Sequence, residues 1–375
     1  MRLRKIQYSE YEGTPQEWVL EEFLLSDVNL LVGKNASGKT RVINVIHNLS
    51  LAIGGRLPLT LGIFRLEFEH DSEVIKYELE KREDKVFREV FSRGSSTLLE
   101  RRAGGFGRIH ANALGKELDF QSPEDQLAIV SRRDKLQHPF FEPIHEWAQS
   151  VYCYRFGTTL GQQHVAVFVA KGLVPVVPVD AKNPDTVVGM YRDGEKRFGE
   201  AFAEAVRQDL AKVGYSIEKV GLMTPTRVQF TGPGELMGLY VKEEDLPGET
   251  DQTSMSQGMF RALSLLVQVN YAILANKPSC ILVDDIGEGL DFERSCGLID
   301  VLMSRAKSSA VQLIMATNDR FVMNRVPLEA WSVLCRKSGR VSVRNYQNSK
   351  DLFDRFSATG LSNFDFLAFD YVNQP

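Results

Sequence analysis

Residues 33–40 have the types and spacing of a phosphate-binding loop. Gly33, Gly38, Lys39 and Thr40 fit the pattern G-x-x-x-x-G-K-[ST], and Lys34, Asn35, Ala36 and Ser37 lie between the two glycines. The apolar residues 28–32 before the loop predict a buried strand, and residues 40–53 after it have the apolar spacing of a helix. The loop is therefore expected between a strand and a helix.

This placement determines the chemistry that the loop can support. Glycines allow backbone N–H groups to close around an anion, and the start of a helix adds the positive end of its dipole. Lys39 is expected to reach the β- and γ-phosphates of a nucleotide, and Thr40 to ligate Mg²⁺. The loop predicts a nucleotide but not the reaction.

A second group of polar residues follows another apolar run. Residues 280–283 are apolar and lead into Asp284 and Asp285, as in a buried strand that carries carboxylates at its end. Asp284 suits the binding of Mg²⁺ through a water molecule, and Asp285 is placed to polarise an attacking water. Paired acids at a strand end are also common as solvated side chains, so this group is informative only together with the loop.

Taken together, residues 33–40, 253–263 and 284–291 resemble the nucleotide-binding core of ABC-type ATPases, closest to the soluble RecF, SMC and OLD-like groups. The resemblance implies an α/β P-loop NTPase with a mostly parallel core sheet, an antiparallel side sheet and a helical lobe. Ser256, Gln257 and Gly258 match the Ser-x-Gly signature that caps a γ-phosphate, and Asp291 matches the D-loop. ATP and Mg²⁺ are the implied ligands.

The chain departs from the family pattern at three positions. Met259 stands where Gln or Glu is usual, and Asp285 replaces the catalytic Glu, so help from Glu288 is expected. Asn318 falls at the switch His; its amide can bond a phosphate but cannot carry a proton. Slow turnover is therefore expected. The family's Q-loop residue is not assignable among the candidates Gln121, Gln126, Gln162 and Gln163.

Composition is that of an ordinary globular protein. The chain has 375 residues, is 43% hydrophobic and 25% charged, and has a net charge of −4. It contains no run of membrane-spanning length and no signal-peptide pattern, so the cytoplasm is expected. The four Cys and six His residues are scattered, and no zinc site is predicted.

Three parts are expected along the chain: 1–115 with the phosphate loop and antiparallel strands, 116–250 as a mostly helical insertion that returns to strands, and 251–375 with the signature and acidic motifs. Helices are predicted within 122–133, 139–151 and 195–213, without the heptads of coiled-coil arms. Tyr8 and Tyr11 are candidates to stack on adenine, although packing is the more common role of such residues. The aromatic residues of 361–375 are expected to pack on the chain's own core or on a partner.

The basic residues around 101–110 allow a second interpretation, a nucleic-acid-binding surface. Arg101, Arg102 and Arg108 flank glycines, which favours a solvated hairpin tip. Further basic residues are candidates to join them in a basic surface: Lys81, Arg82, Arg88, Arg93, Arg132 and Arg133. Because the net charge is −4, any contact with DNA must be local or supplied by a partner.

The resemblance implies an ATPase, converting ATP and water to ADP and phosphate, that forms a head-to-tail dimer around two ATP molecules. The favoured role is DNA-linked: repair or anti-phage defence, with a nuclease or effector protein and double-stranded DNA as partners. The alternative is a protein-assembly module timed by slow hydrolysis, and a transporter motor comes third because no membrane-coupling segment is recognisable.

Overall fold

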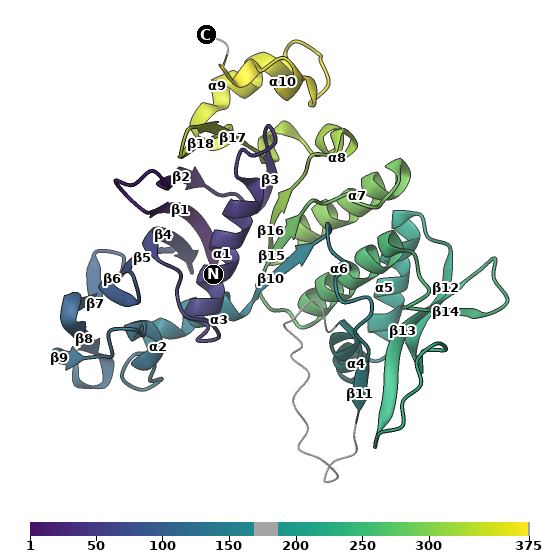
Figure 1. Ribbon diagram of the computed structural model, residues 1–375, viewed down its shortest axis with the longest axis horizontal. Coiled ribbons are helices and arrows are strands. Elements are labelled where there is room, and N and C mark those ends of the chain that lie inside the picture. Colours follow the sequence, from purple (N-terminus) through teal and green to yellow (C-terminus); the bar gives the residue numbers. More distant parts are fainter. Residues whose placement is uncertain (169–186, 374–375) are drawn as a thin grey trace. The chain divides into compact units, whose positions relative to one another are not determined.

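The computed structural model describes residues 1–168 and 187–373. The chain divides into two compact units, the first formed by Met1–Val151 with Pro327–Pro375 and the second by Tyr152–Val326 (Figure 1). The phosphate loop lies in the first unit. The Ser-x-Gly signature and the paired acids lie in the second.

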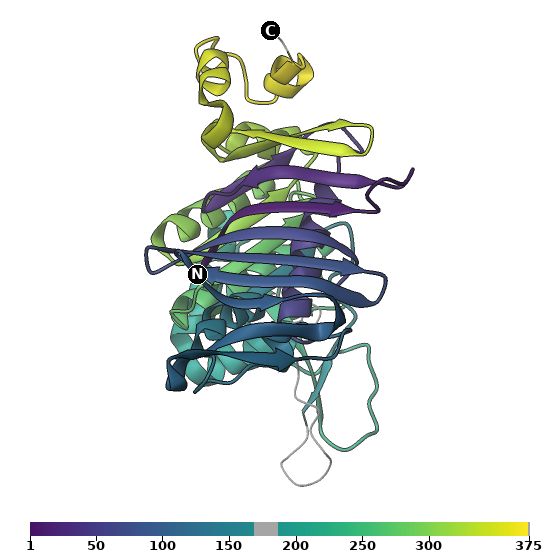
Figure 2. The same cartoon turned by 90° about the vertical axis from the view of Figure 1, so that its left-hand side faces the viewer.

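The first unit is built on a twisted sheet whose strands lie side by side in Figure 2. In spatial order they are β3 (Val28–Val32), β17 (Trp331–Lys337), β18 (Arg340–Asn345), β2 (Trp18–Leu24), β1 (Arg2–Glu10), β4 (Gly62–His70), β5 (Glu73–Arg82), β6 (Lys85–Arg93), β7 (Ser96–Arg101), β8 (Phe106–Ala111) and β9 (Lys116–Gln121). β3 pairs in parallel with β17, and β18 with β2, while the other neighbours are antiparallel. The sheet of this unit is therefore mixed rather than mostly parallel.

Helix α1 (Lys39–Ile53) follows the phosphate loop, as predicted from its apolar spacing. Val42, Ile46 and Leu49 on one side of the helix are completely buried. The helix ends at Gly54 and packs against α3 (Glu142–Gln149). This apolar face anchors α1, so the loop at its N-terminus is held between two fixed elements.

The chain ends in a small helical cap on the same unit, formed by α9 (Tyr346–Ser357), α10 (Asp365–Ala368) and η6 (Tyr371–Asn373). Phe366 is central to it: its ring stacks on Phe353 at 4.9 Å, meets Phe356 edge-on at 5.0 Å and lies 6.4 Å from Trp331 at the start of β17. Of the two expectations for this aromatic segment, packing on the chain's own core is confirmed.

The second unit contains three neighbouring strands in the order β10 (Val151–Arg155), β15 (Ser279–Asp284) and β16 (Val311–Ala316), of which β15 and β16 pair in parallel. Its helices are α4 (Val187–Phe198), α5 (Glu200–Val213), α6 (Gln257–Leu274), α7 (Phe292–Ser308) and α8 (Arg320–Arg325). A second, antiparallel sheet has the order β11 (Ala166–Phe168), β13 (Glu235–Glu243) and β12 (Ile217–Met223), with β14 (Glu249–Asp251) paired to β13.

Three predicted helices differ from the observed ones. The helix expected over 195–213 is broken at Gly199, which has φ 62° and so separates α4 from α5. Within 122–133 only α2 (Ala128–Ser131) is helical, and the residues before it form turns and coil. Residues 139–151 form η3 (Pro139–Phe141), then α3, and end as strand β10 begins.

The remaining short elements are η1 (Ala103–Gly105), η2 (Asn112–Leu114) and η5 (Leu328–Ala330). Within the described ranges, no helix combines the length and the apolar character needed to cross a bilayer.

Candidate nucleotide site

The phosphate loop adopts a backbone that can wrap an anion. Gly33, Ala36 and Gly38 all have positive φ, at 152°, 61° and 104°. A Cβ atom on Gly33 would lie 2.7 Å from the Leu334 carbonyl oxygen, so this position admits only glycine without a backbone shift. The buried Ser37 hydroxyl has no hydrogen-bond partner among the described residues. The loop is thus a cradle with polar groups available for a ligand.

Lys39 closes this cradle. Its side chain is 7% exposed, and its Nζ donates to the carbonyl oxygens of Gly33, at 2.9 Å, and Lys34, at 3.4 Å. The ammonium is therefore held across the loop, where its positive charge favours a phosphate. Thr40 is exposed, as are Lys34, Asn35 and Ala36 at the tip of the loop.

Two residues at the loop were not anticipated from the sequence. Arg336, at the end of β17, donates from Nη1 to the Ala36 carbonyl oxygen at 3.0 Å. Asp370, in the C-terminal cap, lies 3.2 Å from the Lys34 Nζ. Both border a cavity of about 460 Å³ between the loop, the end of β17 and the cap. No local pattern marks either residue, because 300 positions separate Arg336 from Ala36 and 336 positions separate Asp370 from Lys34.

The two tyrosines proposed to stack on adenine occupy different environments. Tyr8 is 4% exposed, donates its hydroxyl to the Leu61 carbonyl oxygen at 2.9 Å, and packs its ring on Phe64. This ring is covered and is not available to a base. Tyr11 is 43% exposed in the connection between β1 and β2. Of the two, only Tyr11 retains the exposure that the stacking hypothesis requires.

The paired acids lie at the end of β15, as predicted. Asp284 is its last residue and is 5% exposed, and Asp285 begins the next loop with φ 56°. The loop is fastened to the end of β16, because the Ile286 N–H donates to Ala316 at 2.9 Å and the Thr317 hydroxyl donates to Ile286 at 2.9 Å.

Parallel pairing of β15 with β16 therefore brings Asn318 to the same sheet edge as Asp285. Glu288 is exposed, and its N–H closes a turn on the Asp285 carbonyl oxygen at 3.0 Å. Asp285, Glu288 and Asn318 therefore lie at the same edge of the sheet in the second unit.

The Ser-x-Gly signature begins α6. Ser256 is the exposed N-cap and accepts a hydrogen bond from the Met259 N–H at 3.2 Å, while Gln257 is also exposed. A Cβ atom on Gly258 would lie 2.4 Å from the Gly289 carbonyl oxygen, so the signature helix presses directly on the loop that leads to Asp291.

Asp291 in turn caps α7 by accepting from the Arg294 N–H at 2.9 Å. This backbone bond and the Arg294 guanidinium lower the pKa of the exposed Asp291 carboxyl. The signature and D-loop segments therefore present two neighbouring helix N-termini, which favour anions.

The glutamines left unassigned by the sequence separate in the structure. Gln121 and Gln163 are exposed, and Gln126 is an exposed loop residue. Gln162 is 5% exposed, and its Nε2 donates to the carbonyl oxygens of Gln252, at 2.9 Å, and Met255, at 2.8 Å. Its amide is therefore engaged with the segment that precedes Ser256.

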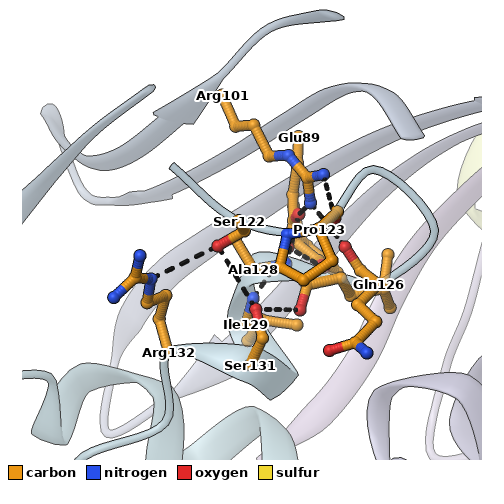
Figure 3. A network of polar contacts seen from close by, with 11 residues as sticks. Glu89, Arg101, Ser122, Pro123, Gln126, Ala128, Ile129, Ser131 and Arg132 are labelled. Atoms are coloured by element: carbon orange, nitrogen blue, oxygen red, sulfur yellow. Dashed lines mark hydrogen bonds and ion pairs between the residues drawn. The ribbon is translucent and has the colours of Figure 1, made fainter. Parts of the chain in front are cut away.

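The basic residues on and beside strands β5 to β9, called the side sheet here, do not form a strongly positive surface. Arg101 is completely buried beside Glu89, and Figure 3 shows it within a network that also contacts the Pro123 and Gln126 carbonyl oxygens. The exposed arginines face acids, in the pairs Arg82–Glu80, Arg88–Glu78, Arg93–Glu73, Arg102–Glu100, Arg108–Asp119 and Arg133–Glu142. Lys81 is buried and donates to Leu59, and Arg132 donates to Gln121. The hypothesis of a basic DNA surface here is weakened.

No cluster of three or more His, Cys, Asp or Glu side chains suited to a metal ion occurs in residues 1–168 and 187–373. The four cysteines are unpaired as thiols, with Cys153 and Cys280 buried. The Thr40 hydroxyl and the Asp284 carboxylate are each oxygen donors of the kind that Mg²⁺ prefers.

Comparisons with known proteins identify the fold. No family model matches the sequence, and no curated protein matches it. A crystal structure of an SMC head bound to the C-terminal winged-helix domain of ScpA matches with a TM-score of 0.53 at 13% identity, covering 92% of this chain and 98% of that one. A second SMC head, with an extended coiled coil and bound to the C-terminal domain of ScpA from Pyrococcus furiosus, matches with a TM-score of 0.51 at 12% identity, covering 95% and 99%.

The class of protein follows from these matches: the chain has a mixed α/β fold of the SMC-head type, in agreement with the family suggested by its motifs. At this identity the likeness defines the fold only. Function has to be argued from the residues of this chain.

Proposed function

We propose that the protein is an ATPase whose two copies close head to tail around ATP. The observation that carries this proposal is the phosphate loop, in which Lys39 is already drawn across a cradle of positive-φ residues. Lys39, Thr40 and Asp284 are assigned to Mg-ATP. When bound, Mg²⁺ neutralises part of the phosphate charge. Ser256 and Asp291 of a second copy are assigned to the other side of the nucleotide.

Exposure of the signature supports an intermolecular role. Ser256 caps a helix that opens to solvent, and Asp291 caps a second helix beside it. Asp285 is proposed to orient the attacking water with help from Glu288, and Asn318 to donate to the γ-phosphate. Because an Asp side chain is one methylene shorter than Glu and Asn cannot carry a proton, slow turnover is proposed. The closed state would then be long-lived.

We consider two alternatives for the process that the closed dimer controls. A DNA-linked role, in repair or anti-phage defence with a nuclease or effector partner, follows from the RecF and OLD-like resemblance. The paired arginines of the side sheet favour the alternative, a nucleotide-timed assembly that captures a protein. The two SMC heads above were solved with a ScpA domain bound, which gives the protein-partner hypothesis a structural parallel.

The dimer is tested first by light scattering of the full chain carrying Asp285→Asn, which should block hydrolysis and trap the closed state. Addition of Mg-ATP should double the mass, and Ser256→Arg should abolish the doubling. An unchanged mass with bound nucleotide would reject the head-to-tail mechanism for this chain alone. Stimulation of wild-type turnover by double-stranded DNA would support the DNA-linked role; ATP-dependent protein capture without DNA would support the alternative.

A further inference from the structure

Arg261 is a buried cation that the proposed nucleotide site does not use. It lies in the second turn of α6, five residues after Ser256, and is 5% exposed. Its guanidinium appears in none of the ion pairs formed by the described residues. Burial lowers the pKa of Arg261. Burial of a guanidinium costs solvation energy unless its hydrogen bonds replace water, so its partners need an explanation.

Those partners are carbonyl oxygens from two loops. Nε and Nη2 donate to the Thr158 oxygen, at 3.2 and 2.9 Å, in the loop after β10. Nη1 donates to the Glu288 oxygen at 2.8 Å, in the loop that begins with Asp285. Nη2 also reaches the Gln257 Oε1 atom, in the first turn of the same helix, at 3.3 Å. One side chain thus joins the signature helix to both loops.

The Glu288–Gly289 peptide is packed from a second side as well. A Cβ atom on Gly289 would lie 2.2 Å from the Arg261 Nη1, and a Cβ atom on Gly258 would lie 2.4 Å from the Gly289 oxygen. This peptide is therefore clamped between the guanidinium and the backbone of the signature turn. It has little freedom to move unless α6 moves with it.

We propose that Arg261 is a positioning residue that makes the Ser256 signature and the Asp285–Glu288 loop move as one body. This inference rests on the proposed ATPase function and deepens it. When a second copy's nucleotide engages Ser256, the guanidinium carries the displacement to Glu288 and so sets where Asp285 holds its water. Arg261 itself does not touch the nucleotide.

The planar fork of arginine is what allows this connection. Its donors point toward Thr158 and Glu288 at the same time, whereas a lysine has a single Nζ on a flexible stem and cannot keep both contacts in one geometry. Arg261→Lys should therefore preserve the charge and release the loop. A displacement of about 1 Å at a reacting group lowers rates by about 100-fold, so a fall in kcat of at least about tenfold is expected.

The test compares the full-length Arg261→Lys protein with Arg305→Lys as a matched control. Arg305 pairs with the buried Asp209 at 2.8 Å in the same unit, and its hydrogen bonds to Asp209 join α7 to α5 rather than to either loop. Binding stoichiometry of fluorescent ATP measures the folded fraction. In Arg261→Lys, stoichiometry and KM should stay near wild type while kcat falls. In Arg305→Lys, kcat per bound nucleotide should be unchanged. Equal kcat in the two variants would overturn the proposal.

Hydrogen exchange gives a readout that does not depend on turnover. In the Asp285→Asn background, ATP should protect peptides covering 256–260 and 285–290 together, and Arg261→Lys should keep the first protection and lose the second. If Arg261→Lys keeps ATP-dependent protection in both peptides, the proposed connection is rejected. If neither the wild-type protein nor Asp285→Asn hydrolyses ATP, the ATPase proposal fails. The hydrogen-exchange comparison then still tests whether Arg261 connects the two segments.

Discussion

Replacing Arg101 by Met should destabilise the first unit strongly, because Arg101 and Glu89 are both completely buried. The guanidinium lies 3.5 Å from the Glu89 carboxylate and donates to the Pro123 carbonyl oxygen at 2.6 Å and to the Gln126 carbonyl oxygen (Figure 3). The substitution removes all of these contacts at once. It leaves a buried carboxylate and two buried carbonyl groups without their cation.

The magnitude follows from that loss. Breaking one side of a buried ion pair costs about 3–5 kcal/mol, which exceeds the net stability contributed by most single contacts. Glu89 keeps its hydrogen bonds from the Ala128 N–H, at 2.7 Å, the Ile129 N–H, at 2.9 Å, and the Tyr77 hydroxyl, at 2.9 Å. These bonds keep the loss toward the lower end of the range. A loss of this size shifts a urea midpoint by about 2 M.

Tryptophan fluorescence isolates this unit, since the chain's three tryptophans, Trp18, Trp147 and Trp331, all belong to it. Urea unfolding of the full chain followed by tryptophan emission therefore reports on the network. The control is Arg102→Met. The Arg102 side chain is 79% exposed beside Glu100, and its loss should change stability by less than about 0.5 kcal/mol.

The pH dependence provides an independent check. Burial raises the pKa of Glu89 above its ordinary value of 4.5, so the folded protein binds this proton more tightly than the unfolded chain does. Stability contributed by Glu89 therefore rises as the pH falls through its folded pKa. Loss of the Arg101 cation raises that pKa further, so the deficit of Arg101→Met should be smaller at pH 5 than at pH 8. A deficit below about 1 kcal/mol, or one that is equal at both pH values, would refute the reasoning.

Two further predictions concern the second unit. Gly258→Ala places a Cβ atom 2.4 Å from the Gly289 oxygen and should abolish ATP-dependent dimerisation in light scattering. The control is Gly157→Ala, whose Cβ atom meets only the Asp285 Oδ2 at 3.6 Å and which should dimerise normally. Dimerisation of both variants would contradict the close approach at Gly258. At Asp251, burial raises the pKa, but the hydroxyl and N–H groups of Thr226 and Thr253 outweigh it and lower the value from 3.8 to about 2. Asp251 therefore stabilises the folded state by about 2 kcal/mol above pH 3.8, and this contribution is lost as the pH falls through 2. Denaturation followed by circular dichroism should show Asp251→Asn less stable than wild type at pH 7 and equally stable near pH 2. A constant difference across that range would exclude Asp251 as the titrating group.

Much of the fold was accessible from local patterns. The strand Val28–Val32 and the helix Lys39–Ile53 lie where the apolar pattern indicates. The helix Gln257–Leu274 follows the Ser-x-Gly segment, as the family resemblance implies. These elements are set by interactions between residues close in the sequence, and the phosphate loop needs only that local order. The division of 195–213 at Gly199 was missed, because a single glycine is tolerated in many helices and its φ depends on how the two halves pack.

What the sequence by itself determined is therefore where the residues with candidate chemistry lie along the chain: a glycine-rich loop that matches a phosphate-binding pattern, paired acids at a strand end, and a Ser-x-Gly segment at the start of a helix. The tertiary structure alone decided which charges are buried and what they hold. Arg101 was expected at a solvated hairpin tip and is buried in the sheet, whereas Arg261 had no visible role and joins two loops. The physical reason is that desolvation and hydrogen-bond geometry depend on residues brought together from distant positions, and residue type alone does not encode those neighbours.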